Sequence, residues 1–330
     1  MDILIIGGAG YIGSHVVREL LDRAHQCTVY DNLSTGVPEN LFPESRFVRC
    51  DILDYPALKG AVSGGAASGG FDAIIHLAAL KAAGESMLEP EKYARNNIIG
   101  TLNILNAAVE AGIKNIVFSS SAAVYGEPEY LPVDENHPLN PSNFYGFTKL
   151  EIERFLGWYE QLRGLHYASL RYFNAAGYDI KGRIQGLEQN PANLLPVIME
   201  AALGIRKEVQ IFGNDYDTPD GTCIRDYIHV SDLATAHAAA LDYICQTGKS
   251  LTVNLGSETG TSVQEVLEIT RRICGKPIPA RISSRRPGDP ARLTASSALA
   301  QKILGWKALY SNMETIVHTS WEAIKGEHHQ

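Results

Sequence analysis

Residues 2–36 read DILIIGGAGYIGSHVVRELLDRAHQCTVYDNLSTG and decide the fold. An apolar run leads into Gly7, Gly10 and Gly13, then apolar residues follow at helical spacing, and a second apolar run ends at Asp31. This order predicts a strand, a tight turn, a helix and a second strand. Because such a turn brings backbone N–H groups and a helix N-terminus to one place, it is suited to bind a pyrophosphate.

Asp31 follows the second predicted strand, where dinucleotide-binding folds carry the acid that accepts hydrogen bonds from the adenosine ribose. An ionised carboxylate there repels a 2′-phosphate, so the sequence predicts NAD rather than NADP. The alternative is a purely structural glycine turn. The strand before the glycines, the helix after them and the acid beyond favour dinucleotide binding.

The alternation of strand and helix patterns continues along the chain. Strands separated by helices require crossover connections, which predicts an α/β fold with a Rossmann-type, doubly wound parallel sheet. Ligands of such sheets bind beyond the carboxyl ends of the strands. Further strands are expected at 46–52, 71–79, 115–126 and 166–174, with helices around 96–111 and 148–163.

Prolines interrupt this pattern after about residue 175. We therefore expect an NAD-binding Rossmann domain at 1–175 and a smaller C-terminal lobe at 176–330. The strand and amphipathic helix at about 225–245 are a candidate to return to the first domain. The Gly, Ala and Ser residues of 63–70 are typical of a flexible spacer.

Composition narrows the function classes. The chain has 330 residues, a formal net charge of −8 and no basic run, which argues against a nucleic-acid or membrane surface. Its five cysteines are scattered and lack metal-ligand spacing, so they are typical of reduced thiols and no metal site is expected. No leader-like segment and no apolar run of ~18 residues occurs, which predicts a cytoplasmic protein.

Tyr145 and Lys149 lie four residues apart on a predicted helix and so share one face. A fixed ammonium beside a phenol favours the phenolate, although a free phenol ionises only near pH ~10. Reaching neutrality takes ~4 kcal/mol of differential stabilisation, which one screened lysine does not supply. The pair is either a catalytic base or an accident of a polar helix, and the rest of the sequence must decide.

The motifs taken together resemble the extended short-chain dehydrogenase/reductase family and, within it, the UDP-galactose 4-epimerases. The resemblance covers almost the whole chain. It is carried by GGAGYIG (7–13), HLAALKAAGES (76–86), SSSAAVYG (119–126), YGFTK (145–149), RYFNAAG (171–177), NLLPVIMEAALG (193–204), IFGNDYDTPDGTCIRDYIHVSDLA (211–234) and RRPGDP (285–290).

This resemblance implies that Tyr145 is the acid/base, that Lys149 lowers its pKa and holds the nicotinamide ribose, and that Ser121 hydrogen-bonds the reacting oxygen. Ser119 and Ser120 are the alternatives to Ser121. The positive ring of NAD⁺ adds the second cation that the phenol needs. The implied reaction inverts carbon 4 of UDP-glucose or UDP-galactose through a 4-keto sugar, with tightly bound NAD, in a homodimer.

Ala122 and Ala123 follow Ser121. Related dehydratases carry an Asp-Glu pair there and decarboxylases tend to carry a glutamate, because their chemistry needs a further acid or base. With alanines at both positions, the chemistry that remains is oxidation of the sugar followed by its re-reduction.

The resemblance also assigns binding residues. Arg225 and Arg286 clamp the substrate pyrophosphate, a role suited to the guanidinium fork. Asp289 binds the ribose, and Phe212 either packs on uracil or lies in the core. The NAD contacts are Gly7, Gly10, Tyr11, Ile12, Gly13, Asp31, Asn32, Ser34, Thr35, Asp51, Ile52, Leu77, Ala78, Ala79, Lys81, Asn96, Ser121, Tyr145, Lys149 and Phe173. The UDP-sugar contacts are Lys81, Ser121, Asn174, Asn193, Leu194, Phe212, Arg225, Arg286, Asp289 and Leu293.

Leu293 bears on specificity, because some family members carry a bulky tyrosine there. A smaller wall leaves room for a 2-acetamido group, so we expect UDP-N-acetylhexosamines to be accepted as well. Two other functions stay open from the sequence. One is a 4-epimerase for UDP-pentoses or UDP-uronates, although no cation for a uronate is identified. The other is a dinucleotide sensor without catalytic activity, which would have no use for Ser121, Tyr145 and Lys149 together.

Overall fold

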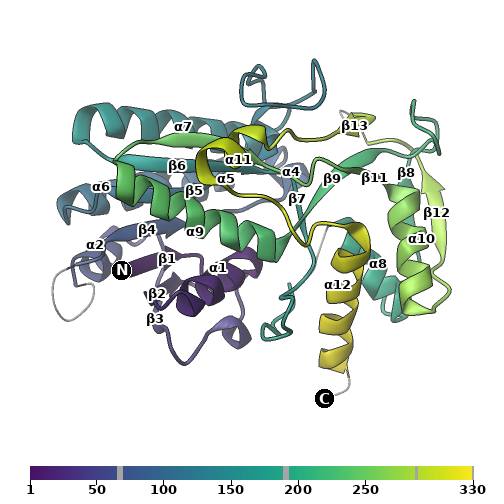
Figure 1. Ribbon diagram of the computed structural model, residues 1–330, viewed down its shortest axis with the longest axis horizontal. Helices are drawn as coiled ribbons and strands as arrows, with labels where there is room; N and C mark the ends of the chain where they lie inside the picture. The colour runs from purple at the N-terminus through teal and green to yellow at the C-terminus, as the bar shows by residue number, and fades with distance from the viewer. Residues whose placement is uncertain (65–69, 189–192, 287–288, 329–330) are drawn as a thin grey trace.

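A seven-stranded parallel sheet forms the centre of the larger lobe (Figure 1). The computed structural model describes residues 1–64, 70–188, 193–286 and 289–328. Its strand order, β3-β2-β1-β4-β5-β6-β10, is the doubly wound arrangement that the sequence predicts. The strands are β1 (Asp2–Ile6), β2 (Gln26–Asp31), β3 (Arg46–Arg49), β4 (Ala73–His76), β5 (Asn115–Ser119), β6 (His166–Tyr172) and β10 (Leu251–Leu255).

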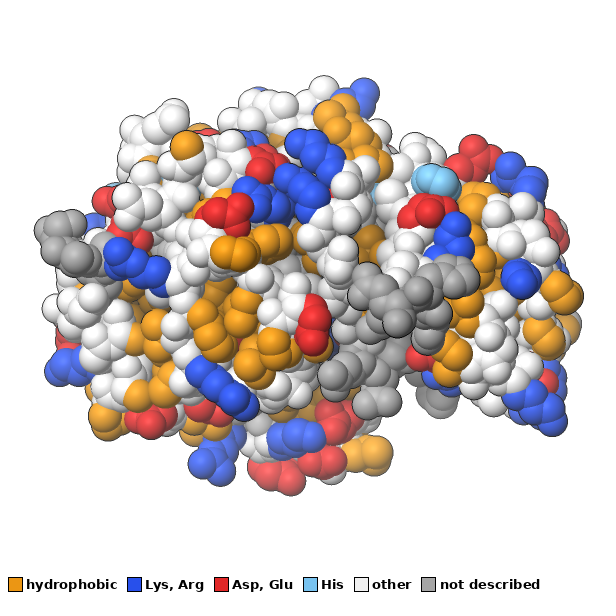
Figure 2. Space-filling view, turned by 90° about the horizontal axis from the view of Figure 1, so that it is seen from below, with side chains coloured by type: hydrophobic (Ala, Val, Ile, Leu, Met, Phe, Trp, Pro, Cys, Tyr) orange, Lys and Arg blue, Asp and Glu red, His pale blue; other side chains and the backbone are white. Residues whose placement is uncertain are grey.

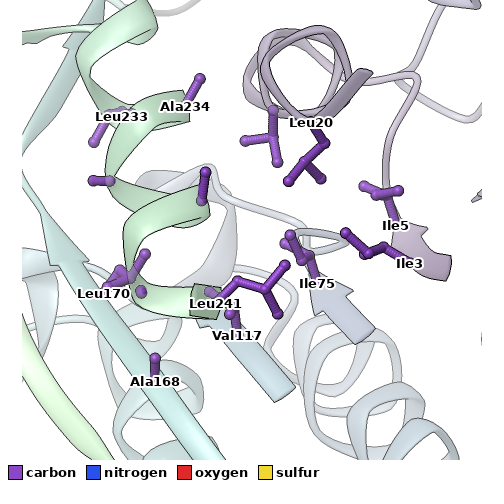
Figure 3. Close-up of a cluster of buried hydrophobic side chains, with 14 of the residues drawn as sticks. Ile3, Ile5, Leu20, Ile75, Val117, Ala168, Leu170, Leu233, Ala234 and Leu241 are labelled. Carbon is purple, nitrogen blue, oxygen red and sulfur yellow. The ribbon is translucent and has the colours of Figure 1, made fainter. Parts of the chain in front are cut away.

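Helices cover both faces of this sheet. Ile3 and Ile5 of β1 point into one core and Leu4 and Ile6 into the other, because successive side chains of a strand alternate. Figure 3 shows Ile3 and Ile5 in the same core as Leu20. The first core lies under α1 (Tyr11–Asp22), α9 (Val230–Thr247) and α11 (Ala298–Leu304), and the second under α2 (Tyr55–Ser63), α6 (Gly100–Glu110) and α7 (Phe144–Arg163).

The seventh strand is a difference from the sequence-based prediction. β10 pairs in parallel with β6 at the sheet edge, and α9 packs against α1, β5 and β6, so the large sheet draws on residues beyond 175. In the segment at about 225–245 the helix joins the large sheet, while β9 (Ile224–His229) joins the smaller lobe. The division at 175 stays a prediction.

The smaller lobe has its own apolar core, in which Ile198, Ile316 and Trp321 are buried. Its sheets have the orders β11-β9-β13, with β7 also paired to β9, and β12-β8. Its strands are β7 (Asn174–Ala176), β8 (Val209–Phe212), β11 (Gly260–Ser262), β12 (Ala280–Ser283) and β13 (Arg292–Leu293), and its helices are α8 (Leu194–Ala202), α10 (Val263–Cys274) and α12 (Met313–His328).

Several predicted elements end earlier than expected. The strand predicted at 115–126 ends at Ser119, because the Ser121 side chain accepts a hydrogen bond from Ala123 N and starts the 3₁₀ turn η3 (Ala122–Val124). The strand predicted at 166–174 divides at Phe173: β6 belongs to the large sheet and β7 to the small one. Phe173 therefore lies where the two lobes meet. The other short elements are η1 (Pro38–Asn40), α4 (Ala83–Ser86), α5 (Pro90–Tyr93) and the π-helical η2 (Ala94–Ile99).

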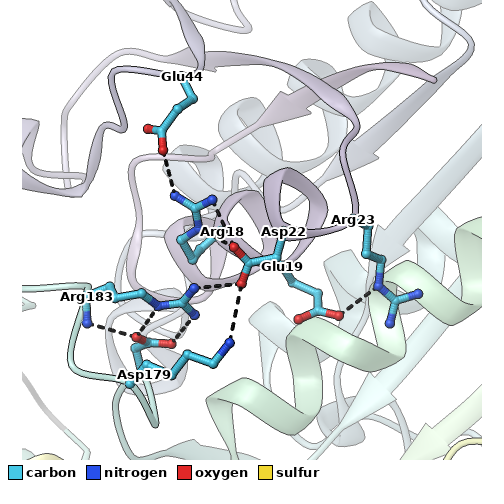
Figure 4. Close-up of polar contacts among 8 residues, drawn as sticks. Arg18, Glu19, Asp22, Arg23, Glu44, Asp179 and Arg183 are labelled. Atoms are coloured by element: carbon cyan, nitrogen blue, oxygen red, sulfur yellow. Dashed lines mark hydrogen bonds and ion pairs between the residues drawn. The ribbon is translucent and has the colours of Figure 1, made fainter.

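Ion pairs tie α1 to the chain that follows β7 (Figure 4). Arg183 binds Asp22 of α1 through Nη1 at 2.6 Å and Asp179 through Nη2 at 2.8 Å. Arg18 adds contacts to Asp22 at 2.9 Å and to Glu44 at 3.2 Å. The helix that opens the predicted dinucleotide site is thus fixed to the segment that leads into the smaller lobe.

The surface carries charges of both signs, and Figure 2 shows them interspersed on one face. Within the ranges that the structure describes, no helix combines the length and apolar character needed to cross a bilayer. Five of the residues expected to form the spacer, 65–69, lie outside those ranges.

Candidate active site

The glycine turn between β1 and α1 has no room for side chains. Gly7 has a φ of +87°, and a Cβ there would lie 2.6 Å from Ala78 N. A Cβ on Gly13 would lie 2.1 Å from the Gly7 oxygen. No side chain caps the start of α1 at Gly10, so its first amides remain available. The turn and the helix N-terminus together fit an anionic pyrophosphate.

Asp31 lies beside this turn at the end of β2. Its Oδ2 accepts a hydrogen bond from Ala9 N at 3.0 Å, and its Oδ1 accepts one from Leu33 N at 2.8 Å. Burial raises the pKa of the carboxyl, while these two bonds oppose that rise. Each carboxylate oxygen keeps capacity for a further donor, so the fixed group can accept a ribose hydroxyl.

Further predicted NAD contacts lie next to Asp31. Asn32 Nδ2 donates to Asp51 Oδ2 at 2.8 Å, and Asn32 Oδ1 accepts from Ser34 N at 2.9 Å. Ser34 and Thr35 are exposed beyond it, whereas Ile52 is buried. The side chains of Asn32 and Asp51 therefore hold each other in place beside the glycine turn.

The predicted contacts after β4 lie on the other side of the turn. The N–H groups of Leu77 and Ala78 both donate to Ile6 O, at 2.8 and 3.0 Å, which holds this segment against β1. Lys81 forms an ion pair with Glu188, which lies in the chain after β7. No sequence pattern indicates that pairing, since the two residues are more than a hundred positions apart.

Asn96 donates through Nδ2 to Asn97 Oδ1 at 3.0 Å. Asn97 is fully buried and joins two elements: its side chain bonds the backbone of Leu80 at 2.9 and 3.0 Å and Thr148 Oγ1 at 3.1 Å. Asn97 was not among the predicted residues, although it supports both the β4 loop and α7.

Ser121, Tyr145 and Lys149 meet at the carboxyl end of β5, where the fold predicts the ligand site. The Ser121 side chain lies close enough to the Tyr145 hydroxyl to lower its pKa. Lys149 is 2% exposed, and its Nζ lies 5.8 Å from the centre of the Tyr145 ring and donates to Ser119 O at 2.7 Å. Asn143 starts α7 by accepting from Gly146 N at 2.8 Å, which fixes the helix turn that carries Tyr145.

The two alternatives to Ser121 have other partners. The Ser119 hydroxyl lies 2.8 Å from His237 Nε2, and the Ser120 hydroxyl donates to Glu153 Oε1 at 2.5 Å. Both serines are buried, at 1% and 0% exposure. Of the three consecutive serines, Ser121 is therefore the one whose hydroxyl faces the tyrosine.

Burial dominates the electrostatics of this cluster. It raises the pKa of Tyr145 to about 12, against a smaller opposing effect from Ser121. It lowers the pKa of Lys149 to about 7, and the charge of Glu153 opposes that change. Both shifts favour neutral groups, so the lysine alone does not turn the phenol into a base at neutral pH. A further positive charge in the cleft is required.

The predicted nucleotide contacts form a second group in the smaller lobe. The Arg286 guanidinium stacks on the Phe212 ring at 3.9 Å, and Phe212 is partly exposed rather than part of the core. Arg225 forms an ion pair with Asp289. Arg225, which is predicted to bind the pyrophosphate, therefore contacts Asp289, which is predicted to bind the ribose. Asn193 precedes the first residue of α8, Leu194.

Leu293 connects this second group to the first. On β13 it pairs with Arg225 of β9, and its side chain packs against the cluster that contains Ala122 and Phe173. Asn174 also reaches β9, because its Nδ2 donates to Asp226 O at 2.8 Å.

A cavity of about 410 Å³ lies between the lobes. Tyr11 lines it from α1 and Asn193 from the start of α8, and Glu188 lines it beside the Lys81 ion pair. Of the predicted binding residues, Tyr11 and Asn193 line this cavity, whereas Ser121, Tyr145 and Lys149 do not.

Sequence reasoning missed two buried charges behind the cluster, Glu153 of α7 and Arg171 of β6. The available signal was the position of Glu153, four residues after Lys149 and therefore on the same helix face.

Comparisons with known proteins agree with this geometry. Residues 3–256 match the model of the NAD dependent epimerase/dehydratase family. A UDP-glucose 4-epimerase of Halalkalibacterium halodurans is 47% identical over 100% of this chain and 97% of its own. The structure of UDP-glucose 4-epimerase from Brucella ovis with NAD has a TM-score of 0.93 and 43% identity, covering 97% of each chain. A UDP-Glc/GlcNAc 4-epimerase from Campylobacter jejuni has a TM-score of 0.85 and 38% identity, covering 98% of this chain and 99% of its own. The chain belongs to the NAD-dependent epimerase/dehydratase family.

Proposed function

We propose that this protein is a UDP-glucose 4-epimerase that interconverts UDP-galactose and UDP-glucose with bound NAD. The observation that carries the proposal is the contact of Ser121 with Tyr145 beside the buried Lys149, followed by Ala122 and Ala123. Among the described residues, such a site supplies Tyr145 as acid/base and has alanines where related dehydratases carry a further acid and base. The full-length similarity to UDP-glucose 4-epimerases supports the same reaction.

The glycine turn, Asp31 and the segment after β4 would hold the NAD. The cradle fits because side chains on Gly7 and Gly13 would collide with backbone atoms, so the chain keeps its backbone open to a ligand. When bound, NAD supplies the acceptor and donor of the hydride at carbon 4.

Tyr145 takes the proton from the 4-hydroxyl and returns it, and Ser121 orients that proton through its own hydroxyl. Lys149 donates to Ser119 O and keeps its remaining donors for the nicotinamide ribose and its charge for the phenolate. A hexose held weakly can turn between two faces while UDP stays bound, which is what inversion at carbon 4 requires.

The smaller lobe grips the UDP in this proposal. Arg225 and Arg286 bind the pyrophosphate, and Asp289 binds the ribose after exchanging its contact with Arg225. Phe212, which already carries a guanidinium on one face, offers a flat surface next to the uracil.

Leu293 forms the wall of the hexose pocket in this proposal, and its size leaves room for a 2-acetamido group. We therefore propose that UDP-N-acetylglucosamine and its galacto epimer are substrates too. Turnover of the N-acetyl and plain hexose pairs, measured side by side, tests this, and a complete absence of N-acetyl turnover refutes it.

A homodimer forms, in this proposal, through the outer face of α7. Trp158 and Leu162 lie one turn apart on that helix and are 59% and 65% exposed. Neighbouring exposed apolar side chains of this size are typical of a protein contact surface. The five free cysteines are consistent with the reducing cytoplasm, where we place the protein.

The decisive experiment is to incubate the purified protein with UDP-galactose without added NAD and to look for UDP-glucose. The proposal predicts conversion, because the coenzyme stays bound and no net oxidation occurs. Absence of conversion both without and with added NAD would contradict it. UDP-pentoses and UDP-uronates in parallel reactions separate the related 4-epimerases.

A further inference from the structure

A buried ion pair lies directly behind the cluster of Tyr145 and Lys149. Glu153, one turn after Lys149 on α7, accepts from Arg171 of β6: Nε reaches Oε1 at 3.0 Å and Nη2 reaches Oε2 at 2.6 Å. The two side chains are 8% and 6% exposed. This is a bidentate pair in the interior of the large lobe.

Stability alone is a poor explanation for such a pair. Removing two charges from water costs about as much as their attraction returns, and apolar replacements of similar volume are often neutral or stabilising. Arg171 is further fixed through Nη1, which donates to Tyr125 Oη at 3.0 Å, and Tyr125 donates to Asn254 Oδ1 at 2.6 Å. The carboxylate of Glu153 is therefore held rigidly, which points to a role in geometry.

Glu153 contacts Ser120, which lies between Ser119, the partner of Lys149, and Ser121, the partner of Tyr145. The Ser119 carbonyl accepts from Lys149, and the Ser121 side chain interacts with Tyr145. Ser120 stands between them and donates its hydroxyl to Glu153 at 2.5 Å. A shift of Ser120 would move both neighbours, because they share its two peptide bonds.

We propose, resting on the proposed function, that Glu153 is a positioning residue. Held by Arg171, it fixes Ser120 and so keeps the Ser119 carbonyl and the Ser121 hydroxyl in register with Lys149 and Tyr145.

The negative charge of Glu153 also supports this cluster, because it favours the ammonium form of Lys149. Burial lowers the pKa of Lys149 to about 7, and the Glu153 carboxylate opposes this. Within the part of the chain that the structure describes, Arg171 of β6 is charged and pairs with Glu153, while burial favours the neutral forms of Tyr145 of α7, His76 of β4, Tyr172 of β6 and His237 of α9. Loss of the carboxylate charge therefore lowers the pKa of Lys149 further, and the ammonium is lost at a lower pH.

Ser120→Ala is the first test, because it removes one hydroxyl and leaves the ion pair intact. With UDP-galactose as substrate, we expect kcat to fall ~10-fold and KM to stay within about twofold, since alignment is lost while the grip on UDP is not. Bound NAD and the thermal unfolding midpoint should stay near wild type. Ser169→Ala is the matched control, because it removes a hydroxyl from a serine of β6 that is as fully buried as Ser120. This variant should keep the wild-type kcat.

Glu153→Gln is the second test, because it keeps an acceptor for Ser120 and removes the charge. We expect the alkaline limb of the kcat profile to move down by about 1 pH unit. Should this variant not fold, Ser120→Ala decides alone. Wild-type kcat in Ser120→Ala, or an equal loss in Ser169→Ala, refutes the proposal, as does an unshifted profile in a folded Glu153→Gln protein.

The proposed function is tested separately. Conversion of UDP-galactose by the wild type and its loss in Tyr145→Phe support that function, and an inert Ser120→Ala change then refutes the positioning role alone. Conversion that survives Tyr145→Phe would instead remove the assignment on which both rest.

Discussion

Tyr145 must be a phenolate before it can accept the proton of the 4-hydroxyl in the proposed reaction, and the protein alone holds the phenolic proton firmly. Burial raises its pKa to about 12, and Lys149, whose own pKa burial lowers to about 7, is an incomplete counterweight. Since a second cation in the cleft is needed, the base of this site is a property of protein and oxidised coenzyme together. Reducing the coenzyme weakens the base, which suits a phenol that must return its proton.

Tyr145→Phe should reduce epimerisation of UDP-galactose by at least ~1,000-fold, because the acid/base is deleted. Bound NAD, read from the absorbance of protein-free extracts, should be unchanged. Tyr159→Phe on the outer part of the same helix, where the hydroxyl binds Asn106 at 2.6 Å, is the control and should be active. Comparable activity in the two variants would remove Tyr145 from its role.

Lys149 also predicts a pH dependence of stability in protein freed of nucleotide. Its pKa is about 7 when folded and ~10.4 when unfolded, so between these values the unfolded chain binds the extra proton. Relative to Lys149→Met, the free energy of unfolding of the wild type should therefore rise with pH across this window, by up to ~1 kcal/mol per unit. Urea titrations of both proteins at pH 7 and 9 measure the slope. A difference in the free energy of unfolding that stays constant with pH would contradict a lowered pKa of the buried Lys149.

At the scale of elements, the connection from β1 to α1 has the tightest packing demands in the site. The chain turns so closely that the Gly7 carbonyl occupies the space of a side chain at residue 13. The same closeness exposes backbone amides to a ligand, so stability and cofactor binding share one requirement.

Gly13→Ala should therefore destabilise the protein by ~2 kcal/mol or more and abolish retention of NAD through purification. Gly60→Ala in α2 is the matched control. A Cβ there meets nothing within 4 Å, and alanine should stabilise that helix by ~0.5 kcal/mol. The thermal unfolding midpoint and the bound nucleotide per chain report both effects. A Gly13→Ala protein that kept its NAD would show that the turn can widen.

The sequence predicts well those elements whose contacts are local. The β1 to β2 unit follows from periodicity and glycine spacing, and the approach of Tyr145 to Lys149 follows from one helical turn. β10 escaped prediction because LTVNL at 251–255, a short stretch with only three apolar residues, carries little signal until β6, some eighty positions earlier, is there to pair with it. For the same reason the Lys81 pair with Glu188 could not be foreseen, since charges reveal no distant partner.

The site residues also differ in whether their contacts are local in the sequence or distant. The resemblance assigns Ser121 among the three serines, whereas the physical reason lies in contacts that the sequence does not show, since Glu153 and His237 bind the other two hydroxyls. Roles in binding that the resemblance implies for residues such as Asn96 and Phe212 stay predictions, because their partners in function are ligands.

At the scale of the whole molecule, the outer face of α7 exposes the apolar side chains of Trp158 and Leu162. The proposed dimer uses the outer face of α7, while the inner face of that helix carries Lys149 and Glu153. Dimerisation would then stiffen the helix that holds the acid/base without touching the cleft.

Leu162→Glu should shift the protein towards monomer in sedimentation velocity at micromolar concentration, because a charge cannot be buried in the contact without a partner. Leu309→Glu, at a leucine that is 71% exposed against 65% for Leu162, is the control and should leave the mass unchanged. Equal sedimentation of the two variants would argue against a contact through α7.

The late arrival of β10 has a consequence for synthesis. A ribosome delivers β6 long before residues 251–255 emerge, so for some eighty codons the nascent sheet has an open edge. α9, which covers the first core, also emerges only shortly before β10. A truncated chain ending near residue 175 should consequently aggregate or recruit chaperones, and stop codons before position 255 should yield insoluble product rather than a free coenzyme-binding fragment.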